Sequence, residues 1–267
     1  MHWLDHGHPL AALVCLLACG VLGWFVPHLI AHIPEPAPEA DPERELQPQP
    51  DTEADTDVTL GEATPVPAAG SAPDKVPYLE VARSPGLAVR CGITSALVGA
   101  LLGASVGLGG VLPCLIFLVP VGVALAVVDW RTMLLPTWVI APSYAAVIVL
   151  LLLAAAVDRD AAALLHAVIG WAVAGGLFWL LWLIYPKGMG YGDVRLSGIL
   201  GLALGYLGWS PLLVGLYGAF LIGGLGGLVL ARLRVVHRKR FPFGPFMLIG
   251  AVVGVAFGPA IAAGLGY

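Results

Sequence analysis

A succession of long apolar runs is the feature of this sequence that most limits its possible folds. The runs lie at 10–30, 87–108, 111–128, 138–157, 161–185, 194–209, 211–231 and 246–265. Most of them have the roughly 20 residues that a helix needs to cross a bilayer, and the run at 194–209 is the shortest. In lipid, a helix satisfies its own backbone polar groups. We therefore expect an all-α polytopic membrane protein with about eight transmembrane helices.

The composition agrees with a membrane protein. Hydrophobic residues make up 59% of the chain and charged residues 11%, whereas a soluble domain has roughly 25% charged residues. The four cysteines lie in or beside apolar runs and form no CxxC pair, so neither a zinc ribbon nor a disulfide framework is indicated. We expect no metal, no cofactor and no nucleic-acid partner, but contact with membrane lipid.

The segment after the first run differs sharply from the rest of the chain. Residues 34–77 interleave prolines with acidic residues, and such a stretch cannot bury enough apolar surface to offset its ordering entropy. We expect three parts: an N-terminal transmembrane helix at 1–33, a disordered cytosolic linker at 34–77, and a membrane bundle at 78–267. The linker could be a solvated spacer or a docking tail.

Glycines repeat every four residues in two of the runs. Gly99, Gly103 and Gly107 form one series, and Gly250, Gly254 and Gly258 form the other. Small residues at this spacing let helix backbones approach closely, so both series predict helix-packing seams.

Basic residues are distributed unevenly over the connections between the runs. Only Arg159 lies in an even-numbered connection, whereas the odd-numbered ones hold or adjoin Arg83, Arg90, Arg131, Lys187, Arg195 and Arg238, among others. Because cytoplasmic loops hold the excess of Lys and Arg, we expect the odd connections inside the cell and both termini outside.

Four acidic residues follow position 81. Asp158 and Asp160 are explained by a solvated outer loop, which leaves Asp129 at the end of the third run and Asp193 at the start of the sixth. Both are expected at the cytoplasmic face. Two carboxylates in a poorly solvated site share a proton, so one can activate water while the other protonates a leaving group. The alternative is a pair of unrelated aspartates that cap helices.

A glycine-rich segment precedes the second aspartate. Gly188, Gly190 and Gly192 stand at alternate positions, and glycine gives the backbone a freedom that allows tight turns and close approach to a ligand.

These residues carry a specific resemblance. Gly190-Tyr191-Gly192-Asp193 resembles the GxGD signature of intramembrane-type aspartyl proteases. Asp129, followed by a short segment ending in Leu135-Pro136, resembles the bacterial type IV prepilin peptidases, and Phe243-Gly244-Pro245-Phe246 is similar to their PFGP segment. The resemblance covers about residues 78–265.

The resemblance implies a membrane aspartic endopeptidase of the bacterial plasma membrane, with its active site on the cytoplasmic side. Its substrates would be type IV prepilin-like or pseudopilin precursors. Asp129 and Asp193 would be catalytic, and Gly190, Gly192 and Pro136 would serve substrate binding or loop flexibility, without a metal.

The sequence departs from the family pattern in two places. Thr137 stands where many members have a second acidic residue, and the acidic linker replaces a cytosolic insert with two CxxC pairs. Many members also methylate the new N-terminus, an activity that we do not carry over to this chain.

Two other classes of function stay open at this point. Paired carboxylates also occur in proton- or cation-coupled transporters with glycine-broken helices, and the acidic linker would suit a non-catalytic scaffold. The sequence leaves the oligomeric state open.

Overall fold

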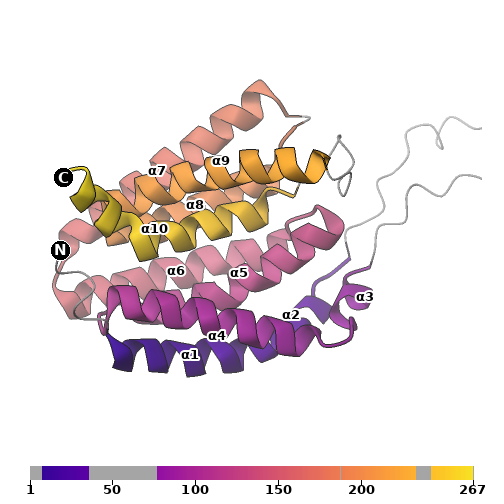
Figure 1. Ribbon diagram of the computed structural model, residues 1–267, viewed down its shortest axis with the longest axis horizontal. Helices are drawn as coiled ribbons and strands as arrows, with labels where there is room; N and C mark the ends of the chain where they lie inside the picture. Colours follow the sequence, from indigo (N-terminus) through magenta and orange to yellow (C-terminus); the bar gives the residue numbers. More distant parts are fainter. Residues whose placement is uncertain (1–7, 36–76, 187, 233–241, 267) are drawn as a thin grey trace, which may run out of the picture. The chain divides into compact units, whose positions relative to one another are not determined.

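The computed structural model describes residues 8–35, 77–186, 188–232 and 242–266. Within these ranges every regular element is a helix (Figure 1). The helices are α1 (Pro9–Trp24), α2 (Val26–Ala31), α3 (Tyr78–Ala82), α4 (Leu87–Val106), α5 (Leu112–Thr132), α6 (Thr137–Asp158), α7 (Ala161–Ile184), α8 (Tyr191–Leu207), α9 (Trp209–Arg232) and α10 (Gly244–Gly264).

Seven helical segments of the described chain are long and apolar enough to cross a membrane: α1 with α2, then α4, α5, α6, α7, α9 and α10. The expected class of an all-α polytopic membrane protein is therefore confirmed. The expected run at 194–209 corresponds to α8, which has 17 residues and is shorter than these seven. Twelve residues of α8 are buried, so neighbouring helices cover most of it.

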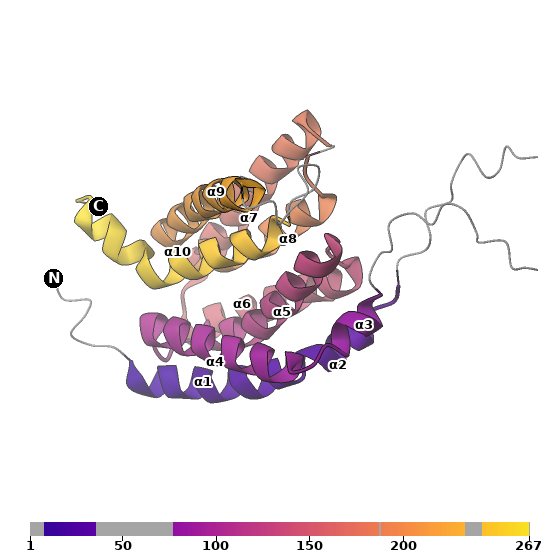
Figure 2. The same ribbon diagram turned by 45° about the vertical axis from the view of Figure 1, so that its right-hand side comes forward.

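Three helix pairs pack along most of their length: α1 with α4, α7 with α8, and α9 with α10. Figures 1 and 2 show α1 and α4 side by side from two directions. At the first pair, a Cβ added at Gly99 would lie 2.7 Å from Cys19 Sγ; at the third, a Cβ at Gly250 would lie 2.5 Å from the Ala219 nitrogen. The two predicted glycine seams are thus real helix contacts.

The α7–α8 pair also packs through glycines. Gly170 of α7 faces Gly201 and Gly205 of α8, and a Cβ on Gly205 would lie 2.5 Å from the His166 carbonyl oxygen. Gly201 and Gly205 are four residues apart, the spacing of the other two seams, but this pair was not among the predicted seams.

The predicted linker at 34–77 lies almost entirely outside the described residues, as does the basic stretch at 233–241. The three-part division therefore stays a prediction.

Candidate active site

Asp129 lies in the last turn of α5, where only 4% of its surface is exposed. Its Oδ2 accepts a hydrogen bond of 3.0 Å from the backbone N–H of Gly244, the first residue of α10. The first N–H groups of a helix have no partner within it, and the helix dipole favours negative charge there. The start of α10 is therefore a good partner for an ionised Asp129.

Only glycine allows this contact at position 244. A Cβ added to Gly244 would lie 2.8 Å from Asp129 Oδ2, closer than real Cβ atoms approach other atoms. The similarity of this segment to the PFGP segment did not predict a role for Gly244. In the structure, the backbone N–H of Gly244 holds the Asp129 carboxylate in place.

Asp193 lies in the first turn of α8, outside the seven candidate spans, and is 7% exposed. Its Oδ1 is buried and has no hydrogen-bond partner among the described residues. Burial and, to a lesser degree, the charge of Asp129 raise the pKa of Asp193 to about 7, although a backbone hydrogen bond at Gly190 lowers it. The two aspartates are thus close enough for the charge of Asp129 to affect the protonation of Asp193.

The two aspartate-bearing segments pack directly on each other. A Cβ at Gly192 would lie 2.6 Å from the Cβ of Leu135, so the Leu-Pro segment and the GxGD segment meet at a position without room for a side chain. Pro136 then begins α6 in an extended conformation, with φ −69° and ψ 122°.

The glycine-rich segment does not adopt backbone conformations that only glycine allows. Gly188, Gly190 and Gly192 are absent from the glycines with positive φ. Gly190 has φ −70° and ψ 141°, which other residues adopt, and a Cβ there would touch Asp193 Oδ2 at an ordinary 3.5 Å. Position 192 requires glycine because there is no room for a side chain. In this conformation, position 190 requires glycine neither for its backbone angles nor for lack of room.

A polar contact joins the same two segments beside the carboxylates. Arg195 donates a hydrogen bond to Thr137 Oγ1, and its guanidinium lies 4.7 Å from the centre of the Tyr191 ring. Tyr144 of α6 donates to the Arg195 carbonyl oxygen at 2.8 Å. Thr137, which stands where many family members have an acid, therefore has a hydrogen-bonding role of its own.

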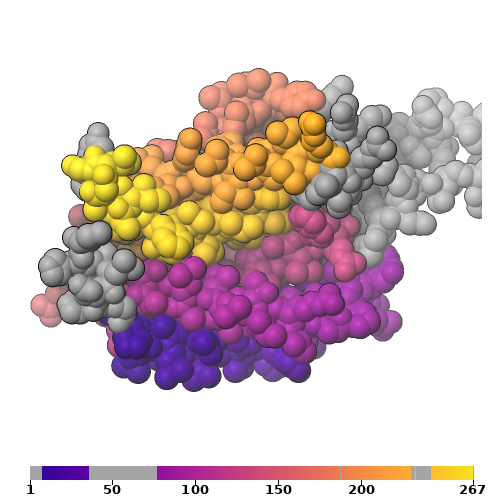
Figure 3. All heavy atoms as spheres, viewed as in Figure 1, coloured from indigo at the N-terminus to yellow at the C-terminus, as the bar shows by residue number. Residues whose placement is uncertain are grey.

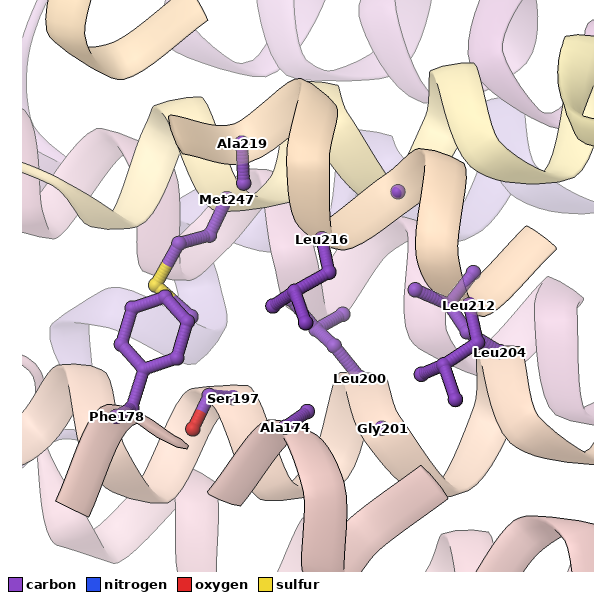
Figure 4. A pocket seen from close by; sticks show the side chains of 11 residues that line it. Ala174, Phe178, Ser197, Leu200, Gly201, Leu204, Leu212, Leu216, Ala219 and Met247 are labelled. Carbon is purple, nitrogen blue, oxygen red and sulfur yellow. The ribbon is translucent and has the colours of Figure 1, made fainter. Parts of the chain in front are cut away.

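A small cavity lies between α7, α8, α9 and α10 (Figure 4). Its volume is about 20 Å³, and Ser197 supplies the only polar side chain in its lining. The Ser197 hydroxyl donates to the Val194 carbonyl oxygen of its own helix. A bound water needs two to four polar partners, so this cavity is poorly suited to supply one to the carboxylates.

The other two acids lie apart from this site. Asp158 accepts hydrogen bonds from the Gly110 N–H at 3.1 and 3.0 Å, and Asp160 caps α7 by accepting from the Ala163 N–H at 3.1 Å. The described residues contain no group of three or more His, Cys, Asp or Glu that could hold a metal ion.

Comparison with known proteins points to one family. Residues 115–229 match the model of the type IV leader peptidase family. A prepilin leader peptidase/N-methyltransferase from Aeromonas salmonicida (strain A449) is 35% identical over 141 residues, which are 52% of this chain and 47% of the relative. One of the same name from Pseudomonas putida is 31% identical over 181 residues, covering 67% of this chain and 60% of the relative.

The chain spans about half the length of the Aeromonas relative. No solved structure matches it. The matched residues 115–229 include Asp129, the Leu-Pro segment and the GxGD segment, so the resemblance seen in the sequence is confirmed. The region of this chain that holds both aspartates matches the type IV leader peptidase family.

Proposed function

We propose that this chain is a membrane aspartic endopeptidase that removes the leader from type IV prepilin-like or pseudopilin precursors. The observation that carries the proposal is the pair of buried carboxylates, Asp129 and Asp193, on two segments that pack together at Leu135 and Gly192. Both segments lie in the region shared with the leader peptidase family.

The two aspartates have different surroundings, and these favour different roles. Asp129 accepts the Gly244 N–H at a helix N-terminus, which favours its ionised form. Asp193 has a buried oxygen without a hydrogen-bond partner in the described part of the chain, which favours the protonated form. In the resting site, Asp129 is the base and Asp193 is the acid.

Hydrolysis then follows without a cofactor. Asp129 takes a proton from water while the water oxygen attacks the peptide carbonyl carbon, and Asp193 gives its proton to the carbonyl oxygen. When the tetrahedral intermediate breaks down, Asp129 returns its proton to the departing amine and Asp193 recovers one from the intermediate's hydroxyl. Each turnover consumes one water and restores both aspartates.

We place the site at the cytoplasmic face of the bacterial plasma membrane. Arg131 follows Asp129 closely, and Arg195 follows Asp193, whereas the opposite connection between α6 and α7 has Arg159 between two acids. This asymmetry follows the positive-inside rule. A precursor would be cut where its leader leaves the membrane on the inner side.

The proposal is limited to the peptidase step. The relatives' names include N-methyltransferase, but this sequence has no CxxC pair of the kind that many family members carry in a cytosolic insert. A transporter is less well supported, because Asp129 and Asp193 lie in terminal turns of their helices instead of at mid-helix.

The direct test is cleavage by the purified full-length protein in liposomes. A prepilin-like precursor should be shortened, and sequencing of the product's N-terminus should show one cut between the leader and the apolar helix. An intact precursor, or proton flux without cleavage, would contradict the proposal.

A further inference from the structure

An apolar groove of about 400 Å³ lies between α4 and α5 on one side and α8 and α10 on the other. Figure 3 shows the surfaces of α4, in magenta, and α10, in yellow, meeting along one face of the molecule. Among the side chains that line the groove, Thr94 is the only polar one. The groove is therefore unsuited to binding a polar ligand, and its occupant must be apolar.

One end of the groove reaches the candidate active site. Ala126 lines the groove three residues before Asp129 on α5, and Pro245 lines it next to Gly244 on α10. Asp129 and Gly244 are the two residues joined by the 3.0 Å hydrogen bond. One end of the groove is thus lined by residues that are close in the chain to the pair that positions the first carboxylate.

The groove extends from there along the direction of the membrane-spanning helices. On α5 it runs from Ala126 back to Leu115, which at 1.5 Å per residue is a length of about 16 Å. Because α5 and α10 are candidate spans, this direction crosses the membrane.

Small residues allow close approach along the groove. Gly122, Ala126, Ala203 and Ala251 contribute to its lining, one or more from each of α5, α8 and α10. Small side chains at a helix surface let a second helix approach closely in lipid. A lipid acyl chain could also lie against these apolar walls, but binding of lipid would not explain why one end of the groove lies close to the carboxylates.

We propose that this groove receives the apolar helix of the substrate, on the carboxyl-terminal side of the cleaved bond. The inference rests on the proposed function and adds the surface that positions the substrate. With the peptide bond at Asp129 and Asp193, a helix in the groove descends from the bond into the membrane between α4 and α10. The other large pocket, about 450 Å³ beside Trp24, His28 and Arg83, is lined only by residues of 24–31 and 79–83, none of which is close in the chain to either aspartate or to Gly244.

Photocrosslinking tests this placement without depending on turnover. A photoreactive residue replaces Val252 in the groove or, as the control, Val149 on the exposed face of α6, both in full-length Asp129→Asn protein in liposomes with the precursor. We expect about tenfold more enzyme–precursor adduct from position 252. The proposed substrate groove is wrong if positions 252 and 149 give equal yields of adduct. It is also wrong if position 252 forms adducts only with lipid or with a second copy of the enzyme. Failure of the wild-type protein to cleave the precursor instead overturns the proposed function.

Filling the groove gives a second test. Ala126→Trp and Val252→Trp should lower kcat/KM for the precursor by about tenfold, mainly through KM, because the added ring occupies the space of the substrate helix. Ala145→Trp and Val149→Trp place the same ring on the exposed surface of α6 and should stay within about twofold. Equal losses in the two pairs of variants, with matching melting temperatures, overturn the inference.

Discussion

The described helices carry two pairs of aspartates, one at each end of α6. Pro136, at the start of α6, adjoins the site of Asp129 and Asp193, and Asp158 ends the same helix 22 residues later, a distance of about 33 Å. Asp158 and Asp160 are exposed, and each accepts backbone hydrogen bonds. Asp129 and Asp193 are buried, and no described residue forms a hydrogen bond with Oδ1 of Asp193.

The difference separates carboxylates that hold a fold together from carboxylates that react. A solvated aspartate that accepts a backbone N–H stabilises a turn or a helix start at little cost. A buried carboxyl without a full set of partners is costly to keep, and such groups cluster at functional sites. The contrast between the two pairs can be tested experimentally.

Replacing each aspartate by asparagine should give the largest contrast. Asp129→Asn and Asp193→Asn each remove a proton-transfer group and should lower the cleavage rate by at least about 10³-fold. Asp158→Asn and Asp160→Asn should stay within about threefold, because asparagine also accepts a hydrogen bond and is a favoured N-cap. The measurement is precursor cleavage in liposomes, with size-exclusion chromatography to confirm folding. Activity in either of the first two variants would remove the distinction between the pairs.

A methyl group at position 244 should have the next largest effect. Gly244→Ala places a Cβ 2.8 Å from Asp129 Oδ2, so the carboxylate must move away from the helix N-terminus, and kcat should fall by about 10²-fold. Gly264→Ala, at the other end of the same helix, meets nothing within 4 Å and is the control. A general folding defect would lower the melting temperature in proportion to activity, whereas a misplaced carboxylate would not.

The third test uses pH, because the pKa of Asp193 is raised to about 7 from an ordinary value of 3.8. Above neutral pH Asp193 loses the proton it must donate, so cleavage should fall by about tenfold per pH unit. Stability should fall with it: between these two pKa values the folded state binds more protons than the unfolded state, so rising pH destabilises the protein.

The pH dependence has its own control within the chain. The melting temperature should decrease from pH 5 to pH 8 in the wild-type protein and in Asp160→Asn, but change much less in Asp193→Asn. A profile in which all three proteins behave alike would show that Asp193 is not the titrating group.

The smallest effect concerns the glycine-rich segment. Gly192→Ala forces a methyl group into contact with Leu135 and should destabilise the protein by about 1–3 kcal/mol, the usual cost of overpacking. Gly190→Ala fits the existing backbone and space, and should change stability by less than about 1 kcal/mol. Thermal unfolding in detergent compares the two. If Gly190→Ala keeps its stability but loses activity, the predicted role of Gly190 in substrate binding gains support.

Much of this molecule could be predicted from its sequence because the relevant signals are local. Apolar runs predicted about eight spans, of which seven are candidate spans in the structure, and a glycine every four residues predicted two helix contacts. Asp129 and Asp193 were found by elimination among four acids and by two short motifs. Each of these signals lies within about 20 consecutive residues.

The contacts that complete the site could not be predicted in this way, since they join distant parts of the chain. Gly244 binds Asp129 across 115 residues, and Arg195 reaches Thr137 across 58. The sequence predicted that Gly192 provides flexibility, whereas in the structure its missing side chain leaves room for Leu135. Which of these roles a glycine has depends on its spatial neighbours.

The burial of α8 also has a consequence for the membrane around the protein. A helix that spans lipid adjusts to bilayer thickness by tilting or by moving its ends relative to the headgroups. With 17 residues, 12 of them buried, α8 is held mainly by other helices. The depth of Asp193 is therefore set by protein packing, and the distance between Asp193 and Asp129 should change little between thin and thick bilayers.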